Sequence, residues 1–199
     1  MSCPSEIHSL LQEIFVDGSA YGQFATVDPN HLPSVRTVHF IAGPNLASIV
    51  INTHIQSEKW ANIASGQSHV SGCYWSQEKR IQFRFSAKAE LIQPKQVEMQ
   101  PHRLSLWNNM RAEVRTAYIL ADHNIPLYRA NPNVDPVPHS PSHGLIVCRP
   151  YCWDIFYEDP KEYRFGKRHI YTLDTNQSWQ KKDVSSLHEK DILLYDSKS

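Results

Sequence analysis

Apolar residues near the start of the chain repeat with a helical period. Ile7, Leu10, Leu11, Ile14 and Phe15 follow the i, i+3, i+4, i+7 spacing of one face of an amphipathic helix. This pattern predicts a helix over residues 5–16.

The apolar period then changes to about two, which is typical of strands. QFATVD (23–28) and SVRTVHFI (34–41) flank the turn sequence PNHLP and predict an antiparallel hairpin. The region 21–92 is therefore expected to hold barrel strands and one short helix. The remaining elements in it are a strand at LASIVIN (46–52), a helix at SEKWANIAS (57–65), and strands at HVSGCYW (69–75) and RIQFRFSAKAELI (80–92).

The second half of the chain has three parts. Residues 95–120 predict a helical insertion, and residues 122–143 predict an extended loop because they contain five prolines. Residues 144–180 predict further strands at GLIVCRP, WDIFY and EYRFGKRHIYTL, and residues 183–199 form a polar end. Short antiparallel strands with few helices indicate a single domain over 1–199, mainly β, with a closed barrel and flanking helices. In the helical insertion we expect one face to carry Leu104, Trp107, Met110, Arg111 and Val114.

Composition narrows the possible partners and the location. The 199 residues have a formal net charge of zero, which argues against a general nucleic-acid binder. No apolar run approaches the roughly 20 residues that span a bilayer, and the first residues lack the cationic region of a signal peptide. Four scattered cysteines suit reduced thiols, so we expect a cytoplasmic protein without nucleic-acid or membrane partners.

Arg36 is the most informative charged residue. In an alternating strand it shares a face with Val38 and Phe40, where a cation is costly unless an anion meets it. A bound phosphate is one such anion, and a carboxylate of the chain itself is the other. Other cations that could join Arg36 in a phosphate cradle are Lys59, which follows Ser57 at a predicted helix start, and Arg164 and Arg168. If Arg36 is instead paired within the chain, Lys59 is simply solvated.

The spacing of histidines and cysteines gives little indication of a metal site or of a catalytic nucleophile. Pro141 separates His139 from His143, so the two cannot share a helix face. Cys148 and Cys152 do not have a usual zinc spacing, and no local motif marks a cysteine–histidine nucleophile pair. We expect no metal site.

Four motifs in order carry a family resemblance. FATVD…LPSVRTVHFI, INTHIQSEKWANI, CYWSQEKRIQFRFSAKAEL and WDIFY…EYRFGKRHIY…W resemble the pyridoxamine 5′-phosphate oxidase superfamily of FMN-binding split barrels. The likeness covers nearly all of residues 21–180 and is strongest to a branch of uncharacterised function, in which RTV and QFR are typical. It implies an antiparallel FMN-binding split β-barrel, an FMN cofactor and a homodimer with the flavin at the subunit interface.

The resemblance also implies the cofactor contacts. Asn52 stands where the family has an aromatic residue, Glu58 where it has an arginine, and Tyr157 where it has a tryptophan. Gln82 is expected to reach the flavin from the partner subunit. The implied FMN-binding residues are Arg36, Thr37, Val38, Asn52, Thr53, Ser57, Lys59, Gln82, Tyr157 and Arg168.

On the substrate side the motifs depart from the family pattern. Ile41 replaces a lysine and Gly166 replaces a histidine, so pyridoxamine phosphate is not the expected substrate. We expect an FMN-dependent oxidoreductase acting on another small molecule, with no identifiable general acid or base. A non-catalytic flavin-binding or haem-binding split barrel is the alternative. The implied substrate-binding residues are Trp107, Arg111, Arg115 and Arg164.

Overall fold

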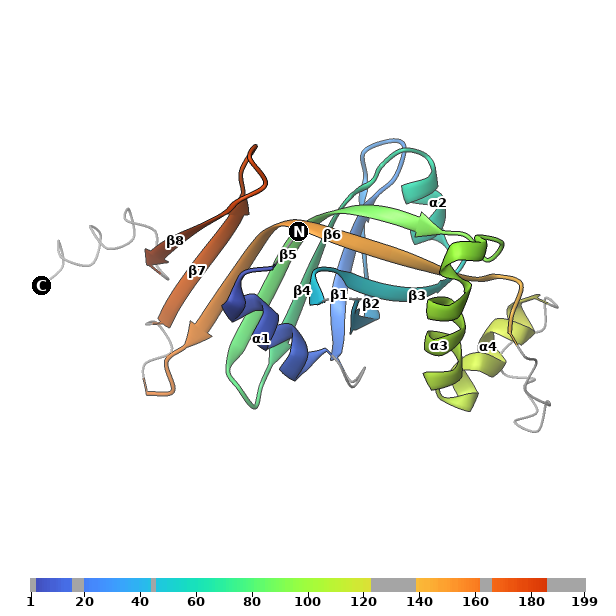
Figure 1. The fold of residues 1–199 in the computed structure, drawn as a ribbon, viewed down its shortest axis with the longest axis horizontal. Coiled ribbons are helices and arrows are strands. Elements are labelled where there is room, and N and C mark those ends of the chain that lie inside the picture. Colours follow the sequence, from blue (N-terminus) through green and yellow to red (C-terminus); the bar gives the residue numbers. More distant parts are fainter. Residues whose placement is uncertain (1–2, 16–19, 44–45, 123–138, 162–165, 186–199) are drawn as a thin grey trace, which may run out of the picture.

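A computed structural model of the chain describes residues 3–15, 20–43, 46–122, 139–161 and 166–185. Eight antiparallel strands form one sheet in the order β3-β2-β1-β4-β5-β6-β7-β8, and β3 also pairs with β6. This second pairing closes six strands into a barrel, which confirms the predicted fold class (Figure 1). The strands are β1 (Ala20–Val27), β2 (Pro33–Ala42), β3 (Ile49–His54), β4 (His69–Ser76), β5 (Ile81–Ile92), β6 (His143–Glu158), β7 (Gly166–Leu173) and β8 (Trp179–Ser185).

The predicted hairpin is present and fixes which way Arg36 points. β1 and β2 pair in a continuous register that places Phe24 opposite Arg36. Val38 and Phe40 are buried on the same face of β2. The Arg36 side chain therefore leaves β2 on the inner face of the barrel.

The barrel interior and two helices share one hydrophobic core. Helix α1 (Ser5–Ile14) and the following Phe15 bury all five predicted apolar residues in it. The short helix α2 (Glu58–Ala64) adds Trp60 and Ile63 to the same core. In the part of the chain that the structure describes, no helix is long and apolar enough to cross a membrane.

The predicted single helix over 95–120 is wrong in detail. The segment forms η2 (Val97–Met99), α3 (Gln100–Asn109) and α4 (Ala112–Asp122), because Met110 has an extended ψ of 144° that interrupts the helical path. The break also changes the expected face: Trp107 is buried, whereas Arg111 and Val114 are exposed. Near α3, an apolar cluster on the outside of the barrel contains Val50, Ile92, Leu145 and Val147, packed against Ile41, Met99 and Leu106.

GLIVCRP and WDIFY form one strand rather than two. β6 runs for 16 residues through Pro150, which has no N–H to donate to the ladder. The register against β5 shifts between Ser86 and Ala87, which face Cys152 and Pro150 and leave Tyr151 as an extra residue. This bulge lets the strand continue past the proline.

The strands also extend beyond residue 180. β8 pairs with β7 up to Ser185, so the start of the predicted polar end belongs to the sheet (Figure 1). Of the predicted proline-rich loop, residues 123–138 lie outside the described residues.

Candidate functional site

Arg36 is held by acceptors that the β1–β2 register brings beside it. Its Nη1 donates to Thr26 Oγ1 at 2.7 Å, to the Ser34 carbonyl at 3.0 Å and to the Phe24 carbonyl at 3.3 Å. Its Nη2 donates to Ser34 Oγ at 2.7 Å and to Glu58 Oε1 at 3.2 Å. A carboxylate of the chain itself therefore meets the strand cation, as one of the two sequence-based alternatives expected.

Helix α2 brings a second cation near Arg36, and β3 and the N-cap of α2 each add a hydroxyl group. Thr53 Oγ1 and Ser57 Oγ lie 3.0 Å apart, and Thr53 is almost fully buried. Lys59 is half-buried and has no hydrogen bond or ion pair to any described residue. We call Arg36, Thr53, Ser57 and Lys59 the Arg36–Lys59 site.

The two cations influence each other. Burial and the positive charge of Arg36 lower the pKa of Lys59, while the neighbouring Glu58 acts in the opposite direction. Two cations and two hydroxyl groups form a donor set that fits a phosphate. These residues therefore fit the phosphate of FMN, and among the described residues Glu58 is the acidic group in direct contact with them.

Asn52 does not join this site. It is adjacent to Thr53 in β3, so the two side chains leave the strand on opposite faces. Asn52 Oδ1 instead accepts a hydrogen bond from His143 Nε2 at 2.9 Å. The cofactor contact of Asn52 stays a prediction.

The Asn52 contact is part of a buried polar cluster beside α3 that sequence patterns did not indicate. Arg103 Nη1 donates to the His143 carbonyl at 3.3 Å and lies 3.5 Å from His143 Nδ1. Arg103 also donates twice to Gln100 Oε1, at 2.7 and 3.2 Å. Because His143 Nε2 donates to Asn52, its Nδ1 is free to accept from Arg103, so the imidazole is neutral. Burial, Arg103 and His139 lower the pKa of His143 to about 3.

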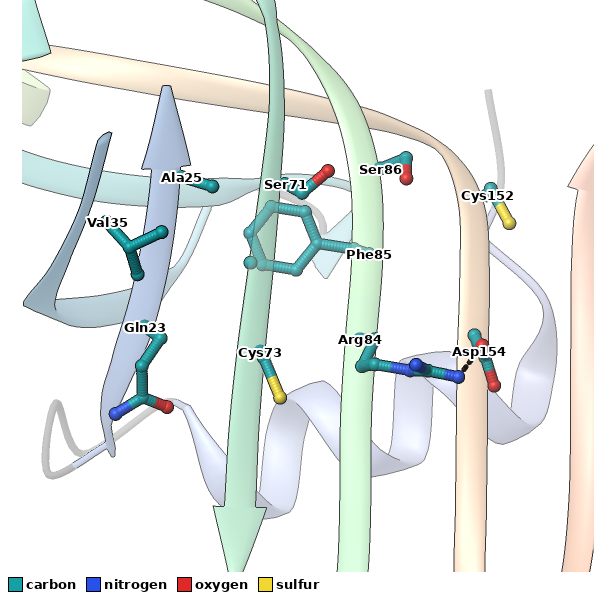
Figure 2. Close-up of a pocket in the computed structure, with 11 residues that line it drawn as sticks. Gln23, Ala25, Val35, Ser71, Cys73, Arg84, Phe85, Ser86, Cys152 and Asp154 are labelled. Carbon is teal, nitrogen blue, oxygen red and sulfur yellow. Dashed lines mark hydrogen bonds and ion pairs between the residues drawn. The ribbon is translucent and has the colours of Figure 1, made fainter. Parts of the chain in front are cut away.

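The outer face of the sheet carries a groove of about 430 Å³. Figure 2 shows Gln23, Cys73, Arg84 and Asp154 in a row across β1, β4, β5 and β6, as their pairing registers require. Asp154 accepts from Arg84 and also from Arg168, whose Nε and Nη2 lie 2.9 and 2.7 Å from its carboxylate oxygens. Asp154 was not identified from sequence, although it shares a face of the predicted strand WDIFY with Phe156.

Three predicted cofactor residues face the groove side of the sheet. Thr37 pairs with Gln23, Gln82 lies two positions before Arg84, and Arg168 is bound to Asp154. The strand alternation therefore puts them on the face opposite to Arg36. Within one chain, the predicted cofactor residues form two separate groups.

Tyr157 is bound to α1. Its hydroxyl donates to Glu6 Oε1 of α1 at 2.6 Å, and the Tyr171 hydroxyl donates to the other oxygen of the same carboxylate. These hydrogen bonds lower the pKa of Glu6 against the effect of burial. Tyr157 therefore joins α1 to the sheet, and its cofactor contact stays a prediction.

Three of the four predicted substrate residues lie in the described part of the chain. Trp107 is 1% exposed and packs against Tyr118 and His143, so its burial argues against a substrate contact. Arg111 donates to the Tyr21 hydroxyl at 2.7 Å, and Arg115 Nε is buried without a hydrogen-bond partner among the described residues. Arg164 lies outside the described residues.

Comparisons with known proteins agree with this architecture. Residues 5–93 match the sequence model of the family described as pyridoxamine 5′-phosphate oxidase, FMN-binding domain. A search of curated proteins gave no match. The chain forms an antiparallel split barrel, and its residues 5–93 are similar to the FMN-binding domain of the pyridoxamine 5′-phosphate oxidase family.

Solved structures share the fold over most of the chain. A pyridoxamine 5′-phosphate oxidase-related, FMN binding protein from Nostoc punctiforme PCC 73102 is 21% identical, with a TM-score of 0.70 over 90% of this chain and 93% of that one. PhzG from Burkholderia lata 383, solved with tetrahydrophenazine-1-carboxylic acid, is 15% identical, with a TM-score of 0.63 over 89% and 86% of the two chains. At these identities the likenesses establish the fold.

Proposed function

We propose that the protein binds FMN with its phosphate at the Arg36–Lys59 site and acts as an FMN-dependent oxidoreductase on a small molecule. The observation that carries this proposal is Lys59, a half-buried cation beside Arg36 with no anionic partner in hydrogen-bond or ion-pair contact among the described residues. An incoming phosphate relieves the repulsion between the two cations and accepts from Ser57 and Thr53. The family model that matches residues 5–93 supports a flavin as the cofactor.

The chain's own residues bind and orient the flavin, and bound FMN supplies the hydride-transfer chemistry. The terminal phosphate monoester of FMN carries close to two negative charges on one phosphate group, whereas each phosphate of FAD carries one and the attached AMP needs more room. The site should therefore prefer FMN to FAD.

Titration of the purified protein with FMN, FAD and riboflavin, followed by flavin fluorescence, tests the cofactor. We expect FMN to bind at least about tenfold more tightly than riboflavin, since charge-assisted hydrogen bonds to a phosphate contribute about 1.5–3 kcal/mol each. Equal affinity for FMN and riboflavin, or a preference for FAD, contradicts the proposal. Tight FMN binding without turnover of any reductant or substrate would leave a flavin-binding protein instead of an enzyme.

We also propose that the working unit is a homodimer. Arg36 lies on the inner face of the sheet and Gln82 on the outer face, so one flavin that contacts both requires two chains. Val35 is 63% exposed at the edge of the groove, which makes it a candidate for burial against a second copy.

Light scattering at micromolar concentration measures the assembly. We expect a dimer for the wild-type protein and a shift toward monomer for Val35→Glu, with weaker FMN binding. Val97→Glu, at another exposed apolar residue on η2, is the matched control and should remain dimeric. A monomer that retains full FMN affinity would exclude a shared site.

The substrate is proposed to be something other than pyridoxamine phosphate. Ile41, in the position of the family's lysine, packs against the apolar cluster beside α3. At Gly166, in the position of the histidine, a Cβ atom would overlap the Tyr157 carbonyl oxygen. Losing groups that orient a substrate reduces turnover strongly. The assay is aerobic oxidation of pyridoxamine phosphate with saturating FMN, and a kcat/KM within about tenfold of a genuine family oxidase measured alongside would contradict the proposal.

A further inference from the structure

Arg36 has little spare hydrogen-bonding capacity. Its two Nη atoms carry four hydrogens, and the five contacts they make run to Phe24, Thr26, Ser34 and Glu58. Four of these contacts are to neutral acceptors on the same hairpin. Glu58 is the one contact that comes from another element and carries a charge.

The hairpin contacts hold the guanidinium in place. Thr26 is fully buried and is also bound by Asn62 Nδ2 of α2 at 3.0 Å, so this acceptor cannot move away easily. The side chain of Glu58, in contrast, is 68% exposed, and its hydrogen bond and ion pair within the described residues are both to Arg36. When an anion approaches Arg36, Glu58 is the group that can leave.

The departure of Glu58 changes the net charge of the site. Glu58 lies between the two cations in sequence and partly offsets the effect of Arg36 on Lys59. With Glu58 in place, the three charged residues sum to a single positive charge. With Glu58 turned toward solvent, Arg36 and Lys59 face a phosphate dianion with two.

We infer that Glu58 is a specificity-determining residue that competes with the FMN phosphate for Arg36. The carboxylate occupies the Nη2 position that the phosphate oxygen needs, and it leaves when FMN binds. Glu58 thereby lowers the affinity for the phosphate ester without affecting the rest of the flavin. This inference rests on the proposed function, because it assumes that the anion at Arg36 is the FMN phosphate.

The test compares Glu58→Gln with the wild-type protein in titrations with FMN and with riboflavin. Glutamine keeps the size and an acceptor for Arg36 but removes the charge. We expect the Kd for FMN to fall by about three- to tenfold, a range typical of a partly exposed charge contact, while the Kd for riboflavin stays within about twofold. Glu90→Gln is the matched control, because Glu90 forms an exposed ion pair with Arg149 at 2.9 Å in another part of the molecule, and it should change neither Kd.

A second variant distinguishes the effect of the negative charge of Glu58 from the effect of its contact with Arg36. Glu58→Asp keeps the charge on a side chain one methylene shorter, so its FMN affinity should lie between those of the wild-type protein and Glu58→Gln. Unchanged or weaker FMN binding by Glu58→Gln would overturn the inference, as would an equal gain in riboflavin affinity. If the wild-type protein and Glu58→Gln both fail to bind FMN, the proposed function itself is wrong.

Discussion

Two arginines of this protein, Arg36 and Arg103, lie in polar networks of different kinds. Arg36 is partly exposed on the inner face of β2, with an exposed carboxylate on one side and a second cation nearby. Arg103 is 2% exposed in α3 and donates to the neutral acceptors of Gln100 and His143. No ion pair of Arg103 occurs within the described part of the chain.

This difference distinguishes a site that a ligand can reach, at Arg36, from a structural network, at Arg103. A ligand can reach Arg36 and can replace an exposed partner, whereas every contact of Arg103 is internal. Burial lowers the pKa of Arg103, which shows the cost of keeping this cation away from water. We therefore propose that Arg36 binds an anion and that Arg103 docks α3 against the barrel.

The largest effect should come from removing Arg103. Arg103→Ala leaves the His143 carbonyl and Gln100 without a donor and opens a cavity, so we expect a loss of about 2–4 kcal/mol in the free energy of unfolding. Chemical denaturation measures this loss. Arg149→Ala, at an exposed arginine, is the control and should change stability by less than about 0.5 kcal/mol. A loss below about 1 kcal/mol for Arg103→Ala would show that the network does not hold α3 in place.

The same network should make stability depend on pH. His143 stays neutral in the folded protein down to a pKa of about 3, whereas in the unfolded chain it takes up a proton below about 6.5. Unfolding therefore binds a proton in this window, and stability that is complete above pH 6.5 is lost as the pH falls toward 3.

The contribution of His143 should be about 1.4 kcal/mol per pH unit between pH 6 and 5. The measurement is the free energy of unfolding of the wild-type protein and of His143→Gln at several pH values. The glutamine variant should show a smaller slope in this range, and parallel curves would contradict the assignment of a neutral buried imidazole.

A smaller effect is expected at Tyr157, which the resemblance placed at the cofactor and the structure places against α1. Tyr157→Phe removes a hydrogen bond to Glu6 and should cost about 1 kcal/mol of stability while leaving the Kd for FMN within about twofold. Tyr171→Phe, which loses a bond to the same carboxylate, is the matched comparison. A tenfold loss of FMN affinity in Tyr157→Phe alone would return this residue to the cofactor site.

The strand pattern was sufficient to predict most of the barrel, because alternating burial is a local property of the sequence. It predicted the β1–β2 hairpin and the inward direction of Arg36. It did not predict that β6 passes through Pro150, since the bulge against β5 depends on a neighbouring strand. Nor did it predict the helix break at Met110, which propensity alone does not mark.

The sequence predicted individual residues of the site but not the contacts between them. Periodicity identified a cation that needs an anion, but not that Glu58 meets it, because this contact joins β2 to α2 across 22 positions. The Arg103 network was missed for the same reason, because it joins Arg103 and Gln100 of α3 to His143 of β6 and, through it, to Asn52 of β3. The family resemblance supplied residue types for the cofactor, yet Asn52 and Tyr157 have other partners in this chain.

The most direct test of the account is the energetic coupling between Arg36 and the phosphate group of FMN. The Kd values of FMN and riboflavin are measured for the wild-type protein and for Arg36→Ala. We predict that the substitution raises the Kd for FMN by at least about tenfold and changes the Kd for riboflavin by no more than about twofold. An Arg36→Ala protein that binds FMN as tightly as the wild type, or that loses both flavins equally, would contradict the assignment of Arg36 to the phosphate.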